Sequence, residues 1–292
     1  MKRIYIASAS ALGLVLLLAG CATHDGGVAV QTTPSAQTAE LPPPPDTITP
    51  MTGAQHAAAL NDPVFVEGMG LAKSGDSSKA RAVLEQAAAA GNPIADYVLA
   101  LHDKNGATPD AGKSLSHAYV AALKGYAPAQ SFLGNHYERA LKVPGNLELS
   151  LRWYRFAAMQ GEPVGSARLA VALLERQTPQ DFTEALDILN RCAQPVGEDA
   201  AYRPVDSKGG APCQSALGFV YLQGMGGVPV DLDQAVRWFQ RAADQQQSHA
   251  EDQLAALYDQ GKGVPKDPAQ ADYWHRRAQA DASRSLDSWT PL

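Results

Sequence analysis

The sequence predicts an all-α protein, an α-solenoid built from about six helix-pair repeats. A short segment of the type Trp238–Ala243 returns along the chain, and its six starts are 34, 36, 35, 50 and 36 residues apart. Periods of this length are typical of stacked supersecondary units. In addition, Asp or Asn stands seven residues before every start, and small residues keep fixed distances from it. Both patterns indicate a repeated helical unit.

The first element along the chain, residues 1–20, is predicted to be a secretory leader. It begins with Lys2 and Arg3 and continues with an apolar run that is too short for a permanent membrane span. It ends at Leu18-Ala19-Gly20-Cys21, which resembles the lipobox of bacterial lipoproteins. The resemblance implies lipid attachment at Cys21, and Ala22 after it implies an outer-membrane anchor facing the periplasm. An ordinary secretory signal that contains a cysteine is the alternative.

Residues 21–60 are predicted to be a lipid-anchored, proline-rich flexible tether. The stretch is rich in Ala, Thr, Gln and Pro, and it includes four consecutive prolines, Pro42 to Pro45. Such a composition lacks the apolar content for a core, and the proline run favours an extended backbone. The segment therefore reads as a spacer, with a proline-motif ligand as the alternative.

The solenoid is expected over residues 61–284, and each repeat has a second helix of roughly 14 residues. Asp and Asn cap helix N-termini, and they form a column of predicted caps: Asp76, Asp110, Asn146, Asp181, Asp231 and Asp267. Positions 4, 7 and 11 after each cap lie on one stripe of a helix. They carry a small, a bulky and a small residue in most repeats. Trp153, Trp238 and Trp274 occupy the bulky position and are expected in the core, and His117 replaces them in one repeat.

A first helix precedes most second helices. Its apolar column is Leu99, Leu133, Leu169, Leu217 and Leu254, flanked by Ala or Gly. Glycine-rich turns, Gly224–Pro229 and Gly261–Pro265, separate the two helices and can end the first in the left-handed conformation. A phosphate-binding loop would need a preceding strand and a following Lys-Ser/Thr pair, and these turns have neither.

The columns, written LGxxYxxGxGVPxDxxxAxxWxxxAA, resemble the Sel-one-like repeat family, which is related to the tetratricopeptide solenoids. The resemblance is close in Leu217–Ala243 and Leu254–Ala278, good in Leu133–Gly161, and degraded around Val83, His117 and Ile188. It implies antiparallel helix pairs in a curved, right-handed superhelix. It also implies a protein-interaction surface without intrinsic chemistry.

One step of the repeat contains an insertion, residues 195–210, flanked by Cys192 and Cys213. Both cysteines stand in columns of Ala or Gly, an exported protein meets an oxidising compartment, and lipidation of Cys21 leaves an even pair. These points predict a Cys192–Cys213 disulfide, with two buried thiols as the alternative. Tyr202 and Arg203 are residue types that anchor interfaces, so the insertion is either a binding element or a tolerated surface loop.

The remaining evidence points to recognition rather than catalysis. No His lies beside Ser or Cys in a nucleophile motif, no pair has zinc-ligand spacing, and the formal net charge of −6 disfavours nucleic acid. We therefore expect no enzyme, no metal and no cofactor, and a protein partner in envelope biogenesis, secretion or signalling. A peptidoglycan- or glycan-binding protein is the alternative, and an envelope hydrolase a weaker third reading. The polar column expected to face solvent and the partner is Asp96, Gln130, Ser166, Gln214 and Glu251. Residues 285–292 form a C-terminal tail that can cap the last pair.

Overall fold

A computed structural model describes residues 41–106, 108–139, 146–194 and 210–287 of the chain. Within these residues there are helices only, and no strand. Their bounds are α2 Gly53–Leu60, α3 Pro63–Lys73, α4 Ser77–Ala89, α5 Pro93–Asn105, α6 Ala111–Leu123, α7 Ala127–Arg139, α8 Asn146–Met159, α9 Pro163–Arg176, α10 Pro179–Ala193, α11 Ala211–Gln223, α12 Leu232–Ala243, α13 Ser248–Gln260 and α14 Pro268–Asp287.

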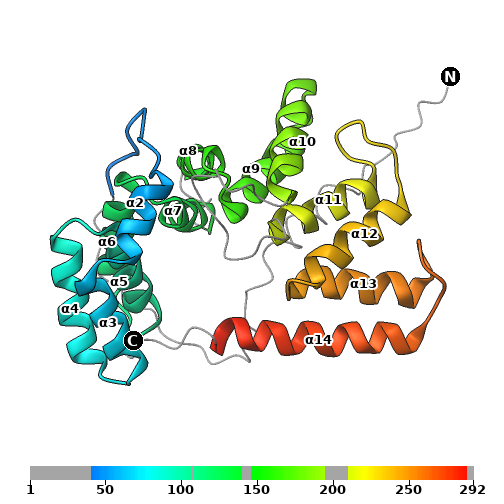
Figure 1. Cartoon of the computed structure of the whole chain (residues 1–292). Coiled ribbons are helices and arrows are strands. Elements are labelled where there is room, and N and C mark those ends of the chain that lie inside the picture. The colour runs from blue at the N-terminus through cyan, green and yellow to red at the C-terminus, as the bar shows by residue number, and fades with distance from the viewer. Residues whose placement is uncertain (1–40, 107, 140–145, 195–209, 288–292) are drawn as a thin grey trace, which may run out of the picture.

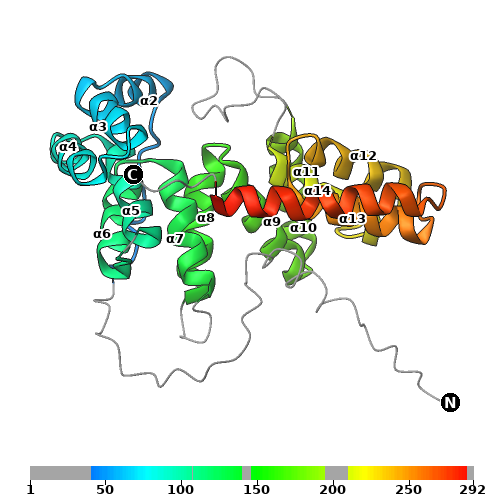
Figure 2. The ribbon, with the colours of Figure 1, turned by 90° about the horizontal axis from the view of Figure 1, so that it is seen from below.

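Six helix pairs stack in chain order, which confirms the predicted all-α solenoid. Each odd-numbered helix from α3 to α13 packs most extensively on the even-numbered helix that follows it. Each pair then contacts the next pair, through α4 and α5, α6 and α7, and so on to α12 and α13. Figures 1 and 2 show the pairs following one another in an arc, with α3–α6 at one end and α13–α14 at the other.

The predicted core columns are buried. All five leucines of the first-helix column are at most 1% exposed, and Trp153, Trp238 and Trp274 are buried in the bulky column of the second helices. The small residues four positions after the caps are buried as well. His117, which replaces tryptophan, keeps 27% of its side chain exposed. In the first pair the buried bulky residue is Leu84, one position beyond the partly exposed Val83.

Four of the predicted caps accept hydrogen bonds from backbone N–H groups of the first helical turn: Asp76, Asp110, Asp231 and Asp267. The cap assigned to Asp181 is wrong, because α10 begins three residues earlier. Thr178 is its N-cap and Pro179 its first residue, and Asp181 N–H donates to Thr178 Oγ1 over 3.1 Å. A proline at the first position leaves no N–H unsatisfied there, so the helix extends back to the threonine.

Glycines in the left-handed region end three of the second helices, at Gly91, Gly125 and Gly161. At the equivalent turn after α12, the residue is Gln246, which adopts φ +61° although its side chain disfavours this left-handed conformation. We expect Gln246→Gly to raise the free energy of unfolding by about 1 kcal/mol, because a left-handed conformation costs a side-chain-bearing residue roughly that much. Urea unfolding of the two chains checks this. A lower midpoint for the glycine variant would show that Gln246 contributes more through contacts than it loses in strain.

The tether predicted over 21–60 differs from the structure in its second half. Residues 1–40 lie outside the described residues, but 41–60 pack on the solenoid. Ile48 and Met51 are buried, and Thr52 begins α2 with a capping box. The composition of the stretch predicted no core of its own, and that holds. Ile48 joins the core cluster that includes α6 and α8, and Met51 and Ala59 join the cluster of α3, α4 and α5.

The predicted disulfide is present. Cys192 at the end of α10 and Cys213 at the start of α11 are bonded, with Cα atoms 5.9 Å apart. The inserted residues 195–209, and with them Tyr202 and Arg203, lie outside the described residues, as do the leader and Cys21. The tail predicted from 285 begins inside α14, which extends to Asp287. No described helix combines the length and the apolar character needed to span a bilayer.

Candidate protein-binding surface

The polar column predicted to face solvent is buried, so that expectation is wrong. Asp96, Gln130, Ser166, Gln214 and Glu251 are each at most 4% exposed. They lie on the first helices, at the level where the preceding second helix ends. The last carbonyls of a helix lack intrahelical partners, and two members of this column donate hydrogen bonds to such carbonyls.

Gln130 and Gln214 show this role most clearly. Gln130 Nε2 donates to the carbonyl of Ala122 over 3.1 Å, and Gln214 Nε2 donates to that of Ala193 over 3.0 Å. Each amide oxygen then accepts from a glutamine that follows the next second helix. Gln160 donates to Gln130 over 2.9 Å, and Gln245 donates to Gln214 over 2.7 Å. A polar bridge therefore joins three successive helices, and it is part of the scaffold rather than an exposed contact surface.

Asp96 builds a charged version of the same bridge. Its Oδ2 accepts from Lys124 Nζ over 2.7 Å, and its Oδ1 lies 3.5 Å from His117 Nδ1. The other nitrogen of the same ring, His117 Nε2, lies 3.9 Å from the carboxylate of the buried Asp103, which also forms an ion pair with Arg81 of α4. His117 thus replaces the tryptophan where the interior holds two carboxylates. Among the described residues no group of three or more His, Cys, Asp or Glu side chains is placed to hold a metal ion.

Glu251 forms the last member of the column, between α13 and α14. Arg277 Nε lies 2.7 Å from Glu251 Oε1, and the buried Asp281 carboxylate lies 3.7 Å from the same Nε. Burial, followed by the nearby Asp281, raises the pKa of Glu251 to about 7, although Arg277 acts in the opposite direction. Asp252 also faces the group and adds to the increase.

We expect the stability of the protein to depend on Glu251 between pH 5 and pH 8. The folded carboxyl keeps its proton up to about pH 7, whereas the ordinary value is 4.5, so the folded state binds more protons and loses stability as pH rises. Glu251→Gln should therefore gain stability relative to wild type as pH rises from 5 to 8. Urea unfolding at both pH values measures this, with the exposed Asp259→Asn on the same helix as control. A difference that does not change with pH would contradict the assignment.

The surface of the solenoid carries a bound stretch of its own chain. Residues 41–51, which precede α2 (Figure 1), lie along α6 and α8 without helix or strand structure. Arg152 Nη2 of α8 donates to the carbonyls of Pro44 and Pro45 over 2.9 and 3.2 Å, and Tyr119 Oη of α6 donates to that of Pro43 over 3.4 Å. At the other end, Met51 N–H lies 3.3 Å from both Gly125 O and Gln160 Oε1.

Apolar contacts accompany these hydrogen bonds. Pro44, Ile48 and Met51 are buried. Ile48 joins the cluster of Trp153, Leu115 and Ala118, with Tyr119 and Phe156 around Trp153 at ring-centroid distances of 5.8 and 6.1 Å. Met51 belongs to the neighbouring cluster of α3–α5, against which Tyr126 packs. We refer to the face of α6, α8 and the turns that follow them, which carries residues 41–51, as the segment groove.

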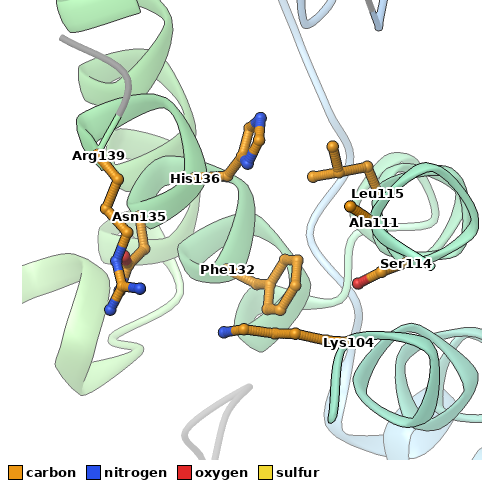
Figure 3. A pocket seen from close by; sticks show the side chains of 8 residues that line it. All are labelled: Lys104, Ala111, Ser114, Leu115, Phe132, Asn135, His136 and Arg139. Atoms are coloured by element: carbon orange, nitrogen blue, oxygen red, sulfur yellow. The ribbon is translucent and has the colours of Figure 1, made fainter. Parts of the chain in front are cut away.

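A cavity of about 210 Å³ lies beside this cluster, between α5, α6 and α7 (Figure 3). Leu115 lines it and also belongs to the cluster that holds Ile48. The lining includes Lys104, His136 and Arg139 and no acidic side chain. Lys104 Nζ lies 4.9 Å from the centroid of Phe132, and burial together with Lys104 lowers the pKa of His136. Such a lining suits a small anionic group better than a cation.

The comparisons with known proteins agree with this architecture. A family model described as Sel1 repeat matches residues 65–92, 127–162, 211–246 and 248–278. These ranges cover the pairs α3–α4, α7–α8, α11–α12 and α13–α14, so the match includes the first pair, where the sequence pattern is degraded.

Two solved structures show a similar fold. One is c5321, a protective antigen present in uropathogenic Escherichia coli strains displaying an SLR fold. It is 28% identical, with 73% of this chain and 43% of that chain covered and a TM-score of 0.54. This chain therefore spans less than half the length of c5321. The other is a Sel1 repeat protein from Oxalobacter formigenes, 22% identical, with 80% and 92% covered and a TM-score of 0.53.

No curated protein matches the chain. The four matched ranges, the stack of six helix pairs and the two structural neighbours lead to one conclusion. The chain contains four Sel1 repeats, and its fold is similar to that of solved Sel1 repeat structures.

Proposed function

We propose that this protein is a lipid-anchored scaffold of the bacterial envelope, facing the periplasm, which binds a protein partner through the surface of its solenoid. Sel1 repeats generally mediate protein interactions and are mostly non-catalytic. On this proposal the protein supplies geometry and contacts, and the chemistry of any process in which it acts belongs to its partner.

One observation carries the proposal. The residues of the repeat motif are buried in the stack, whereas large apolar side chains outside the motif remain exposed on the helices. Examples are Val120 and Leu123 of α6, Leu147 and Met159 of α8, and Tyr273 of α14, which are 37–69% exposed. Exposed apolar side chains that the fold does not need are typical of binding surfaces when they gather on neighbouring elements. Among the described residues nine large apolar side chains are exposed, and α6 and α8 carry four of them.

The location rests on the sequence of the leader and on the disulfide. Leu18-Ala19-Gly20-Cys21 provides the lipobox, and the Cys192–Cys213 bond suits an oxidising compartment such as the periplasm. Two or more acyl chains on Cys21 would hold the protein at a membrane for long times.

Two measurements on intact cells test the proposal. Cys21→Ser should release the protein from the membrane fraction, because the lipid attachment is lost. Chemical crosslinking of the wild type, followed by purification and mass spectrometry, should return one or a few envelope proteins reproducibly. A wild type that stays in the soluble fraction would exclude the anchor, and enrichment of glycan without any reproducible protein would replace the scaffold by the glycan-binding alternative.

A further inference from the structure

We propose that the segment groove of α6 and α8 is a binding site for an extended, proline-containing peptide of a protein partner. Residues 41–51 occupy this site in cis. The inference rests on the proposed scaffold function and names the class of partner segment. It uses a different observation, the seating of residues 41–51 on the solenoid.

The polar groups of the groove match a proline-rich chain. Over Pro43–Pro45 the groove presents only donors, Tyr119 Oη and Arg152 Nη2, and both address backbone carbonyls. Proline residues offer a carbonyl but no N–H, so a proline run leaves no donor unsatisfied against such a surface. At Met51 the groove changes to acceptors, Gly125 O and Gln160 Oε1, and the segment there has an N–H to donate.

The apolar contacts set a spacing. Pro44, Ile48 and Met51 point into the solenoid, and the residues between them are exposed. Pre-formed proline-rich segments lose little conformational entropy when they dock on aromatic-lined grooves, and Trp153, Tyr119 and Phe156 provide aromatic rings here. A matching partner segment therefore has prolines at its N-terminal end, followed by two apolar residues that replace Ile48 and Met51.

The turn after α6 is adapted to a bound backbone. Gly125 has φ +84°, and a methyl group on it would collide with the carbonyl of Thr49 and come within 2.9 Å of Met51 N. The equivalent Gly91 and Gly161, at φ +104° and +74°, have open space at the same place. All three glycines satisfy the turn, but only Gly125 is also approached by another backbone.

The combination of a tyrosine and an arginine is particular to this groove. Tyr119 and Arg152 stand nine and six residues after Asp110 and Asn146, the predicted caps of their helices. The same positions hold Glu85 and Ser116 between α4 and α6, and Gln240 and Tyr273 between α12 and α14. Arg237 of α12 also stands six residues after its cap, but no tyrosine accompanies it at the position equivalent to Tyr119 in α10.

Occupation in cis has a quantitative consequence. A segment joined to its site by a short connection competes at a local concentration of about 1 mM or more, so a free peptide binds the wild type weakly. The apparent affinity rises in proportion to the fraction of molecules whose groove is open. Displacement of residues 41–51 would also free the chain between the membrane anchor and α2.

The test uses a fluorescent peptide with the sequence of residues 41–51, LPPPPDTITPM, and the full chain in detergent. The variant Ile48→Ser/Met51→Ser weakens the cis segment and keeps the groove intact. We expect it to bind the peptide at least about tenfold more tightly than the wild type in fluorescence anisotropy. In that background Arg152→Ala should lose the gain, and the matched Arg237→Ala, six residues after the α12 cap, should retain it.

Circular dichroism confirms that each variant keeps its helices. Equal binding by the wild type and Ile48→Ser/Met51→Ser, or equal losses for Arg152→Ala and Arg237→Ala, would overturn the inference. So would a wild-type dimer that exchanges residues 41–51 between copies. If crosslinking still captures the envelope partner from the Arg152→Ala chain, the scaffold function stands and only the assignment of the groove fails.

Discussion

Removal of the Cys192–Cys213 bond should lower the free energy of unfolding by about 3 kcal/mol. The bond joins α10 to α11, and its two cysteines are 21 positions apart in the sequence. In the unfolded chain this closure restricts the ends of the insertion, and a loop of this length accounts for a cost of that size. The native fold keeps the two helix ends adjacent, as Gly210 N–H donates to the carbonyl of Cys192 over 2.9 Å.

The best variant for this test is Cys192→Ala with Cys213→Ala. Both cysteines stand in columns where the other pairs carry alanine or glycine, so alanine fits the packing on both sides. Urea unfolding of the wild type with and without dithiothreitol gives a second, independent measurement. The reductant should lower the midpoint of the wild type and leave the double variant unchanged. Equal midpoints for the wild type and the double variant, each with and without dithiothreitol, would show that the bond does not form or does not contribute to stability.

The second large effect is expected from Gly218→Ala, at the crossing of α11 and α12. A Cβ at Gly218 would lie 2.6 Å from the ring of Phe239, which is fully buried and also packs edge-on against Phe219. Alanine adds up to about 1 kcal/mol of helix propensity, but overpacking of a closed site costs about 1–3 kcal/mol. We therefore expect a net loss of about 1–2 kcal/mol in the free energy of unfolding.

A double-mutant cycle separates the two terms. Phe239→Leu removes the ring, so it should cost stability alone but relieve part of the loss caused by Gly218→Ala, with a coupling energy of about 1 kcal/mol. Gly70→Ala in the exposed part of α3 is the matched control, because nothing lies within 4 Å of its Cβ position. This control should gain stability. A gain for Gly218→Ala as well would mean that the two helices do not approach as closely as the structure shows.

The helices, their order and their core were predictable because burial follows the helical period. The columns that begin at Leu99 and Trp153 repeat at fixed distances, and each such position packs on a neighbouring pair. The helices approach closely where Gly134 faces Tyr154 and where Gly218 faces Phe239. These contacts also recur with the repeat, but predicting them requires the crossing geometry of the helices. That geometry depends on tertiary contacts and is not contained in a periodic pattern.

The candidate surface was less predictable, for two physical reasons. Polarity indicates exposure only where the side chain has no better partner than water. Gln130 and Gln214 satisfy the last carbonyls of the preceding helices, and a list of polar residues does not reveal that. The second reason concerns residues 41–51. Their composition rules out a core of their own, but Ile48 and Met51 after the proline run were a usable signal, since apolar residues at the end of an extended stretch can join an existing core.

The docked segment also changes the expected reach of the anchor. If Cys21 carries the lipid, about 20 residues separate it from Leu41, where the docked segment begins, instead of about 40 from Leu60. Fully extended, they span at most about 70 Å. Release of residues 41–51 would add about 11 residues to that connection, so occupation of the segment groove would affect both binding and position relative to the membrane.

The most direct test of the segment groove is hydrogen exchange at the backbone amide of Met51. In the wild type this N–H is held between Gly125 O and Gln160 Oε1, so it should exchange far more slowly than in an unstructured chain. Gly161→Ala should keep this protection, and Gly125→Ala should abolish it while the amides of α5–α9 stay protected. Exchange of the wild-type Met51 amide at the rate of an unstructured peptide would contradict the account.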